Sequence, residues 1–301
     1  MSSVTIKTEG LTKHYGKVEA LVGLNLEIAG GEIFGFLGPN GAGKTTTIRT
    51  MMDEIRPTSG KASILGMDTH EKSVEIRTHI GYLPGDLAMY PNLTGMDTIT
   101  YFANLRGGVD YKHVDGLAER LDADLSKKVG DLSSGNRQKV GLIQAFMSKP
   151  EVLIMDEPSS GLDPLVQREL QKMMREVADG GCTVFLSSHT LSEVQRVADR
   201  VGIIRHGHLV ALEAVHELRA KAMRQVELEL DAPADVSVFE AVEGVRDVRA
   251  QGNHALMTFG GDMGALLKAI EGRYTIVDIS TQSADLEEIF LTYYQDEEVS
   301  S

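Results

Sequence analysis

GPNGAGKTTT, residues 38–47, is the stretch around which the rest of the chain is arranged. It fits the phosphate-loop pattern G-x-x-x-x-G-K-[ST] in full, with Lys44 and Thr45 at its end. The seven residues before it, GEIFGFL at 31–37, form a short apolar run of strand length. The residues after it, TTTIRTMMDEI, have helical apolar spacing, and we expect Pro57 to stop that helix. The sequence therefore predicts a buried strand, a phosphate loop and a helix, in that order.

The residue types of this loop suit a phosphate group. Glycines let backbone N–H groups turn inward, and the helix N-terminus adds partial positive charge, so the loop forms an anion-binding cup. We expect Lys44 to reach the β and γ phosphates and the Thr45 hydroxyl to ligate Mg²⁺. The alternative is a glycine-rich turn between a strand and a helix that binds no ligand.

The composition limits the class of protein. The 301 residues are 42% hydrophobic and 25% charged, which suits one large or two modest globular domains. No apolar run approaches the ~20 residues that cross a bilayer, and MSSVTIKTEG lacks a leader pattern, so we expect a cytoplasmic protein.

The single cysteine, Cys182, excludes an internal disulfide, and we expect it to be a small buried residue. The net charge of −14 argues against a general nucleic-acid or anionic-membrane surface, so a membrane role would need a protein partner.

Two further runs end in residues that suit phosphate chemistry. EVLIMDEP, residues 151–158, predicts a buried strand that places Asp156 and Glu157 at the C-terminal edge of a parallel sheet, where α/β proteins bind ligands. We expect Asp156 to position Mg²⁺ and Glu157 to polarise the attacking water as general base; the alternative is a solvated loop with incidental acids. CTVFLSSH predicts a strand that ends in His189, which we interpret as a γ-phosphate contact.

The other elements follow from local patterns. Tyr15 either covers the sheet or stacks on an adenine base. The remaining expectations are paired strands at 4–8 and 24–28, a strand near 60–66, a polar helix at about 69–78, a strand at 80–84, a helical insertion at 96–130, a polar turn at Ser133–Asn136 followed by a helix, and a β-hairpin that turns at His206–Gly207.

Together these motifs resemble the ATP-binding subunits of ABC transporters, over about residues 4–220. The LSSGN element at 132–136, which lies 20 residues ahead of Asp156, narrows the choice among NTPases. In that family the LSSGN turn of one subunit closes over the ATP held by the other, so two ATPs are sandwiched in a head-to-tail dimer. The resemblance implies a homodimer, or a heterodimer with a related ATPase, that binds ATP and Mg²⁺.

The resemblance also assigns site residues. It makes Tyr15 the adenine stacker, Ser133 and Gly135 γ-phosphate contacts in trans, Asp163 a part of the dimer interface, and His189 the residue that holds the γ phosphate. Catalysis falls to Glu157, His189 and Lys44, and the metal site to Thr45 and Asp156. The phosphate cup comprises Asn40, Gly41, Gly43, Lys44, Thr45 and Thr46, and the loop residues Gly38, Pro39 and Ala42 are also assigned to nucleotide binding.

Two departures from the family pattern stand out. Ser134 and Asn136 replace the glycine and glutamine of the usual LSGGQ turn, and both remain small or polar. Gly85 stands where the family places a glutamine that touches Mg²⁺ and the attacking water. Either Asp86 substitutes as an acid or the site hydrolyses ATP slowly, and both possibilities stay open.

The tail, about residues 225–301, follows the order βαββαβ, which is ferredoxin-like, and we expect a last helix in LEEIFLTYY. Such a tail looks like the accessory region of drug- and antibiotic-exporting members whose permease is a separate chain. The predicted fold is α/β: a P-loop NTPase of ABC type, with a mixed sheet core and a helical subdomain, plus a small α+β ferredoxin-like domain. The predicted domains are 1–220 (nucleotide-binding, helical subdomain about 86–148) and 221–301 (accessory).

The predicted function is that of an ATPase subunit, peripheral at the cytoplasmic face of the cell membrane, which powers efflux of drugs or other hydrophobic compounds. Its membrane contact runs through a separate transmembrane permease. The first alternative is a soluble ABC ATPase that acts on ribosomes or DNA. A single nucleotide-binding unit, no coiled coil and an acidic charge argue against it. The second is a regulatory subunit that binds ATP without useful turnover, which Gly85 favours and which Glu157 and His189 oppose.

Overall fold

In the computed structural model of the protein, residues 3–221 and 224–282 are described. Their contacts divide the chain into two compact units, Met1–Leu212 and Glu213–Ser301. Within the described ranges no helix is both long enough and apolar enough to cross a membrane. The division into a nucleotide-binding domain at 1–220 and an accessory domain at 221–301 stays a prediction.

The first unit contains a four-stranded antiparallel sheet in the order β2-β1-β4-β5. Alternating apolar and polar residues put Ile6 and Ile28, which are partners in the register, into the core. The predicted pairing of 4–8 with 24–28 is confirmed, and both strands continue through the stretch that was expected to separate them. The strands are β1 (Val4–Tyr15), β2 (Val18–Ala29), β4 (Ser59–Ile64) and β5 (Met67–Asp68).

A six-stranded sheet, in the order β10-β9-β3-β8-β7-β6, positions the candidate site. Strands β9, β3, β8, β7 and β6 run parallel, and β3, β7 and β8 are buried along their whole length. The register sets Leu37 beside Ser188 and Asp156 beside Ser187, so the residues that follow these strands meet at one edge. The strands are β3 (Ile33–Leu37), β6 (Ile80–Leu83), β7 (Val152–Asp156), β8 (Thr183–Ser188), β9 (Arg200–Arg205) and β10 (His208–Ala214).

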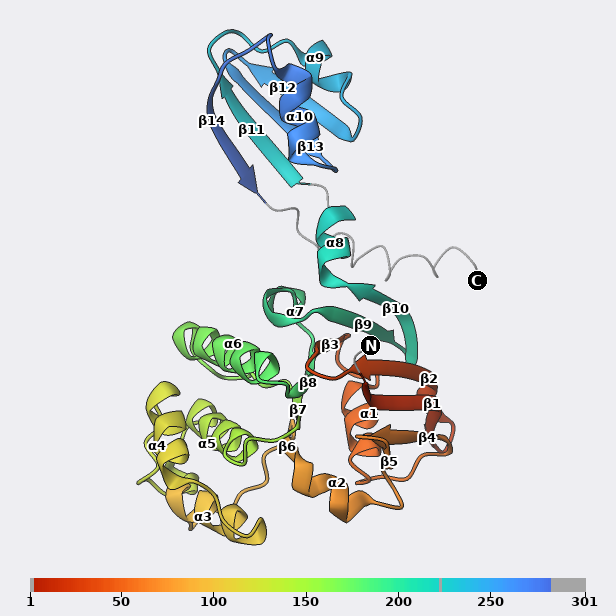
Figure 1. Cartoon of the computed structure of the whole chain (residues 1–301), viewed down its shortest axis with the longest axis vertical. Coiled ribbons are helices and arrows are strands. Elements are labelled where there is room, and N and C mark those ends of the chain that lie inside the picture. The colour runs from red at the N-terminus through yellow and green to blue at the C-terminus, as the bar shows by residue number, and fades with distance from the viewer. Residues whose placement is uncertain (1–2, 222–223, 283–301) are drawn as a thin grey trace. The chain divides into compact units, whose positions relative to one another are not determined.

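The main core lies between these two sheets, around helix α1 (Lys44–Met51) (Figure 1). Ile48 of α1 is fully buried there, and the ring of Phe185 lies 5.8 Å from that of Phe34 and 5.5 Å from that of Phe36. Helices α5 and α6 lie on the opposite side of the six-stranded sheet (Figure 1). The further helices of this unit are α2 (Ser73–His79), α3 (Gly95–Leu105), α4 (Tyr111–Arg120), the 3₁₀ turn η1 (Val129–Asp131), α5 (Ser134–Phe146), α6 (Pro164–Asp179) and α7 (Leu191–Val197).

Two boundary predictions had different outcomes. The hairpin turn at His206–Gly207 is confirmed, because both residues have left-handed φ angles, 47° and 79°, between β9 and β10. The expectation that Pro57 stops the loop helix is wrong: α1 ends at Met51, well before the proline. The reason is local, since Asp53 adopts a φ of 54°.

Helices α3 and α4 form the predicted helical insertion between β6 and β7. Thr94 begins α3 with a capping box, in which its side chain and that of Asp97 each accept a hydrogen bond from the other's backbone N–H at 3.0 Å. At the end of α4, Arg120 pairs with Glu176 at 2.6 Å and with Glu169 at 2.7 Å. Both acids lie on α6, so this arginine links the insertion to the helix that covers the sheet.

The second unit has the ferredoxin-like element order that was predicted, with strands in the order β12-β13-β11-β14 and antiparallel neighbours. Apolar residues alternate along β11, so Val226 and Leu228 pack against Phe239 and Leu266 from the helices. The last helix expected in LEEIFLTYY lies outside the described residues. The elements are α8 (Val215–Lys221), β11 (Arg224–Leu230), α9 (Val236–Glu240), β12 (Val245–Gln251), β13 (His254–Phe259), α10 (Met263–Ile270) and β14 (Ile276–Gln282).

Candidate nucleotide site

The loop between β3 and α1 adopts the conformation that its glycines permit. Gly41 and Gly43 have left-handed φ angles of 81° and 112°, and a Cβ atom on Gly43 would collide with the carbonyl oxygen of Ala20. Hydrogen bonds join the loop to two neighbouring segments. The Gly38 N–H donates to the carbonyl of Ser188 at 3.3 Å, and the Gly207 N–H donates to the carbonyl of Ala42 at 2.9 Å. Its path is therefore set by the strands beside it.

The loop surrounds a cavity of about 180 Å³ that opens at the C-terminal edge of the six-stranded sheet. The loop residues of the predicted phosphate cup contribute most of its wall, and one residue comes from the end of β7. The lining residues are Ala20, Pro39, Asn40, Gly41, Gly43, Lys44, Thr45, Thr46 and Glu157.

Lys44 is the first residue of α1, and its side chain is 6% exposed. Its ammonium donates hydrogen bonds to the carbonyls of Gly38 at 2.6 Å and Pro39 at 3.3 Å. It also lies 3.3 Å from Oε1 of Glu157. Buried ammonium groups need such partners, so the lysine is held inside the loop, next to the predicted base.

Thr45 and Asp156 meet as the sequence led us to expect. The Thr45 hydroxyl donates to Oδ2 of Asp156 at 2.6 Å, and the aspartate is 2% exposed. The hydroxyl of Ser187 donates to the other carboxylate oxygen, Oδ1. Ser187 lies beside Asp156 in the register of β7 and β8, and its hydroxyl therefore positions the carboxylate. The sequence analysis did not identify this residue.

Glu157 lies between two basic groups. Its Oε2 is 2.8 Å from Nδ1 of His189, opposite the Lys44 contact at Oε1. The residue has a left-handed φ of 51°, a conformation that costs about 1 kcal/mol or more for a side-chain-bearing residue. Its backbone N–H donates to the Ser187 carbonyl at 3.2 Å, and Gln138 of α5 donates to its carbonyl at 3.3 Å. The surroundings thus hold a strained residue in place, and sequence reasoning also missed Gln138.

Tyr15 does not line the cavity. It ends β1, the residue is 47% exposed, and Lys13 Nζ lies 5.1 Å from the centre of its ring. A cation over one ring face leaves the other to solvent or to a second ring. The stacking role stays a prediction.

Ser133 and Gly135, the predicted contacts in trans, also lie outside the cavity lining. The expected turn at Ser133–Asn136 is the beginning of α5: Ser133 is the N-cap residue, and its hydroxyl accepts from the Asn136 N–H at 3.3 Å. A Cβ atom on Gly135 would collide with the carbonyl oxygen of Gly161, so the backbones approach closely there. These residues therefore lie at the N-terminus of a helix that does not line the cavity of the same chain.

Asp163, the predicted dimer-interface residue, has a local role that the sequence analysis did not assign. It is the N-cap of α6, and its carboxylate accepts from the N–H groups of Leu165 at 3.0 Å and Val166 at 3.1 Å. The hydrogen bond from Val166 holds the pKa of the Asp163 carboxyl below its usual value. An acid directly before a proline that begins an apolar-spaced helix, as in Asp163–Pro164, is the pattern that would have predicted the cap.

Gly85 lies where β6 ends, against the predicted metal ligand. A Cβ atom on Gly85 would stand 2.8 Å from Oδ2 of Asp156 and 3.2 Å from its Cγ. A side chain at this position would therefore require Asp156 to move. Asp86 is exposed.

We predict that Gly85→Ala lowers ATP hydrolysis by about tenfold and raises the Mg²⁺ concentration needed for half-maximal rate, because the new methyl group displaces Asp156 from Thr45. The measurement is steady-state phosphate release over a Mg²⁺ titration. Gly116→Ala is the matched control, since a Cβ there meets nothing within 4 Å and α4 favours alanine. An unchanged rate and Mg²⁺ dependence in Gly85→Ala would show that the contact does not matter.

Comparisons with known proteins support the interpretation of this cavity as a nucleotide site. A family profile described as "ABC transporter" matches residues 21–160. The bacitracin transport ATP-binding protein BcrA of Bacillus licheniformis is 33% identical over 296 residues, which cover 96% of this chain and 97% of that protein. The daunorubicin resistance ATP-binding protein DrrA3 of Streptomyces coeruleorubidus is 36% identical over 226 residues, 73% of this chain and 72% of that protein. A solved structure of an ATP-binding subunit of an ABC transporter matches with a TM-score of 0.66 and 29% identity, over 71% of this chain and 92% of that one.

Proposed function

Because this chain belongs to the ABC transporter family and is an ATP-binding subunit with ATPase activity, we propose that its hydrolysis of ATP powers efflux through a separate transmembrane permease. The proposed cargo is a drug or another hydrophobic compound, since the relatives are named for bacitracin transport and daunorubicin resistance. The observation that carries the proposal is the contact of Glu157 with both Lys44 and His189, where Lys44 and Glu157 line one cavity, in a chain that matches BcrA over 96% of its length.

In this proposal the loop binds the ATP phosphates and Lys44 contacts the β and γ oxygens. Glu157 accepts a proton from the attacking water, whose oxygen bonds to the γ phosphorus while the bond to the bridging oxygen breaks. His189, 2.8 Å from Glu157, orients this carboxylate and contacts the γ phosphate. Lys44 offsets negative charge that develops on the phosphate oxygens.

Thr45 and Asp156 fit Mg²⁺, because their hydroxyl and carboxylate oxygens lie 2.6 Å apart beside the phosphate cup. When bound there, the ion would neutralise charge on the β and γ phosphates. Ser187 would keep the Asp156 carboxylate aimed at this position through its hydrogen bond to Oδ1.

A second copy of the chain, or a related ATPase, would complete the site. Ser133 and Gly135 lie at a helix N-terminus outside the chain's own cavity, and such a terminus suits a phosphate group. We assign them to the γ phosphate of the partner's ATP in a head-to-tail dimer. Closing and reopening of that dimer would move the permease between two states. The subunit would then be peripheral, at the cytoplasmic face of the cell membrane.

The test of the transport proposal is gentle affinity purification from native membranes, with identification of whatever remains bound in stoichiometric amount. A polytopic membrane protein is the expected result, and its retention should survive Glu157→Gln. Ribosomal or DNA-repair components without a membrane protein would overturn the transport proposal and leave the ATPase assignment intact.

We predict that Tyr15→Ala weakens ATP binding about fivefold, because loss of a stacked ring costs about 1 kcal/mol. The measurement is calorimetric titration with ATP. Tyr111→Ala on α4 is the matched control, since Tyr111 is 43% exposed and Tyr15 is 47% exposed. Unchanged affinity in Tyr15→Ala would return Tyr15 to the role of covering the sheet.

A further inference from the structure

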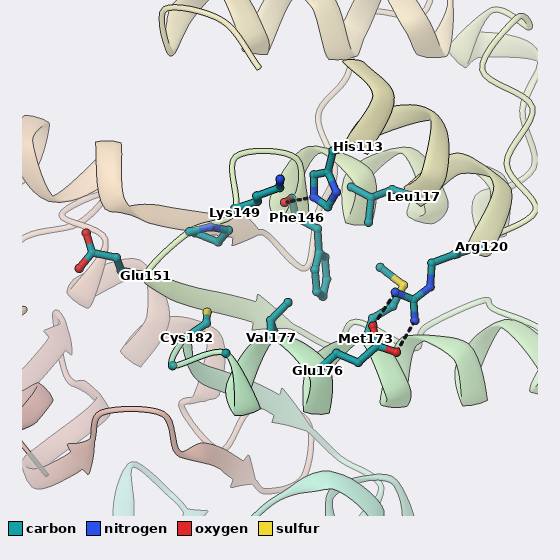
Figure 2. A pocket seen from close by; sticks show the side chains of 13 residues that line it. His113, Leu117, Arg120, Phe146, Lys149, Glu151, Met173, Glu176, Val177 and Cys182 are labelled. Atoms are coloured by element: carbon teal, nitrogen blue, oxygen red, sulfur yellow. Dashed lines mark hydrogen bonds and ion pairs between the residues drawn. The ribbon is translucent and has the colours of Figure 1, made fainter. Parts of the chain in front are cut away.

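A second cavity, of about 400 Å³, lies at the other edge of the six-stranded sheet (Figure 2). The nucleotide site follows the carboxyl ends of β3, β7 and β8, whereas this cavity is lined by the residues just before β7 and β8, Glu151 and Cys182. Helices α4 and α6 and the end of α5 supply the remaining walls. Its volume is within the usual range of small-molecule sites, about 300–1,000 Å³.

The walls of this cavity are mainly apolar. Leu117, Phe146, Met173 and Cys182 are each less than a tenth exposed, and Val177 is half-buried. Figure 2 shows the Phe146 ring and the Val177 side chain extending into the same space, with the Cys182 sulfur beside them. Sulfur atoms and an aromatic ring make favourable contacts with an aromatic or aliphatic body.

The charged groups around the cavity differ in how fully they are paired. Arg120 binds Glu176 through two hydrogen bonds of 2.6 and 2.9 Å. The carboxylate of Glu151 points away from the cavity in Figure 2 and pairs with His79 at 2.6 Å. In contrast, the Lys149 ammonium has a long, solvent-exposed pair, 4.0 Å from Asp110.

His113 lies at the same side of the cavity as Lys149 (Figure 2). Its Nε2 is 3.4 Å from the carbonyl oxygen of Phe146, a long contact. Both acids that line the cavity thus pair with basic partners, and the weakly paired polar groups of the lining are those of Lys149 and His113. The cavity therefore combines an apolar interior with one weakly paired ammonium group, that of Lys149.

We propose that this cavity is a binding site for an amphipathic organic anion, a molecule with an apolar body and one carboxylate or sulfonate group. The body fits among Leu117, Phe146 and Met173, and the anionic group pairs with Lys149. Such a ligand contacts α4 and α6 together, the two helices that Arg120 links. It stabilises the folded chain by mass action, because the assembled cavity exists only in the folded state.

The probe for the test is 8-anilinonaphthalene-1-sulfonate, with nonanoate as an aliphatic competitor, on the full chain. Fluorescence titration is expected to show saturable binding that nonanoate displaces. Lys149→Ala should weaken binding about fivefold, and Val177→Trp, which fills the cavity, more than tenfold. Lys172→Ala is the matched control, because this exposed lysine of α6 lies outside the lining. Equal affinity in all variants would overturn the proposal.

Cys182 supplies an independent readout, since it is the chain's single cysteine and lines the cavity. Burial raises its pKa to about 12, so its reaction with N-ethylmaleimide should be slow without a ligand. Bound probe should slow the reaction further in the parent chain and in Lys172→Ala, and ATP should not. Alkylation that is insensitive to saturating probe would place the probe elsewhere and overturn the assignment, even if a variant proves unstable.

Discussion

Replacing Glu157 with glutamine is expected to lower the rate of ATP hydrolysis by about a hundredfold or more while ATP still binds. Glutamine has nearly the same shape, so it can stay between Lys44 and His189, but it cannot accept the proton of the attacking water. Binding depends on the loop and Lys44, which the substitution leaves in place. The measurements are phosphate release, calorimetric ATP binding and the oligomeric state with ATP, where a nucleotide-bound dimer should accumulate.

Glu151→Gln is the matched control for this substitution. Glu151 immediately precedes β7 and pairs with His79 at 2.6 Å, whereas Glu157 immediately follows the same strand. Its substitution removes one carboxylate from the same segment and should leave hydrolysis within about twofold of the parent rate. A Glu157→Gln chain that hydrolyses ATP at the parent rate would show that another group takes the proton.

The central part of the fold is predictable because its motifs follow buried parallel strands. GEIFGFL, EVLIMDEP and CTVFLSSH each read as a short apolar run, and parallel strands bring the residues after such runs to one edge of the sheet. For this reason the proximity of Thr45 to Asp156, and of Glu157 to His189, could be expected before any coordinates. The ferredoxin-like order of the tail followed likewise from alternation along its strands.

The supporting contacts were not predictable, because they depend on register and on the packing of distant segments. Ser187 matters through its place opposite Asp156 in the sheet, and Gln138 through the side of α5 that faces the end of β7. The close approach of Asp156 to Gly85 likewise could be found only from a distance between two strand ends. Spacing along the chain carries no information on such contacts between elements.

Lys44→Ala is expected to weaken ATP binding by about a hundredfold or more. The ammonium is buried, is held by the carbonyls of Gly38 and Pro39, and faces the cavity that the phosphates would enter. Loss of a buried, charge-assisted contact costs about 3 kcal/mol or more, which is about two orders of magnitude in affinity. The measurement is ATP titration by calorimetry. Lys61→Ala, an exposed lysine paired with Glu9, is the control that should leave affinity unchanged.

The same substitution should also lower the free energy of unfolding, because it leaves the buried Oε1 of Glu157 without its cation 3.3 Å away. A second change separates this effect from nucleotide binding. In the double variant Lys44→Ala/Glu157→Gln, a neutral amide replaces the unpaired carboxylate of Glu157. Much of the lost free energy of unfolding should therefore return, while ATP affinity stays low. If the double variant regains affinity as well as stability, Lys44 acts on the nucleotide only by holding Glu157. If it regains neither, the conformation of the loop itself requires the lysine, whose ammonium donates to the carbonyls of Gly38 and Pro39.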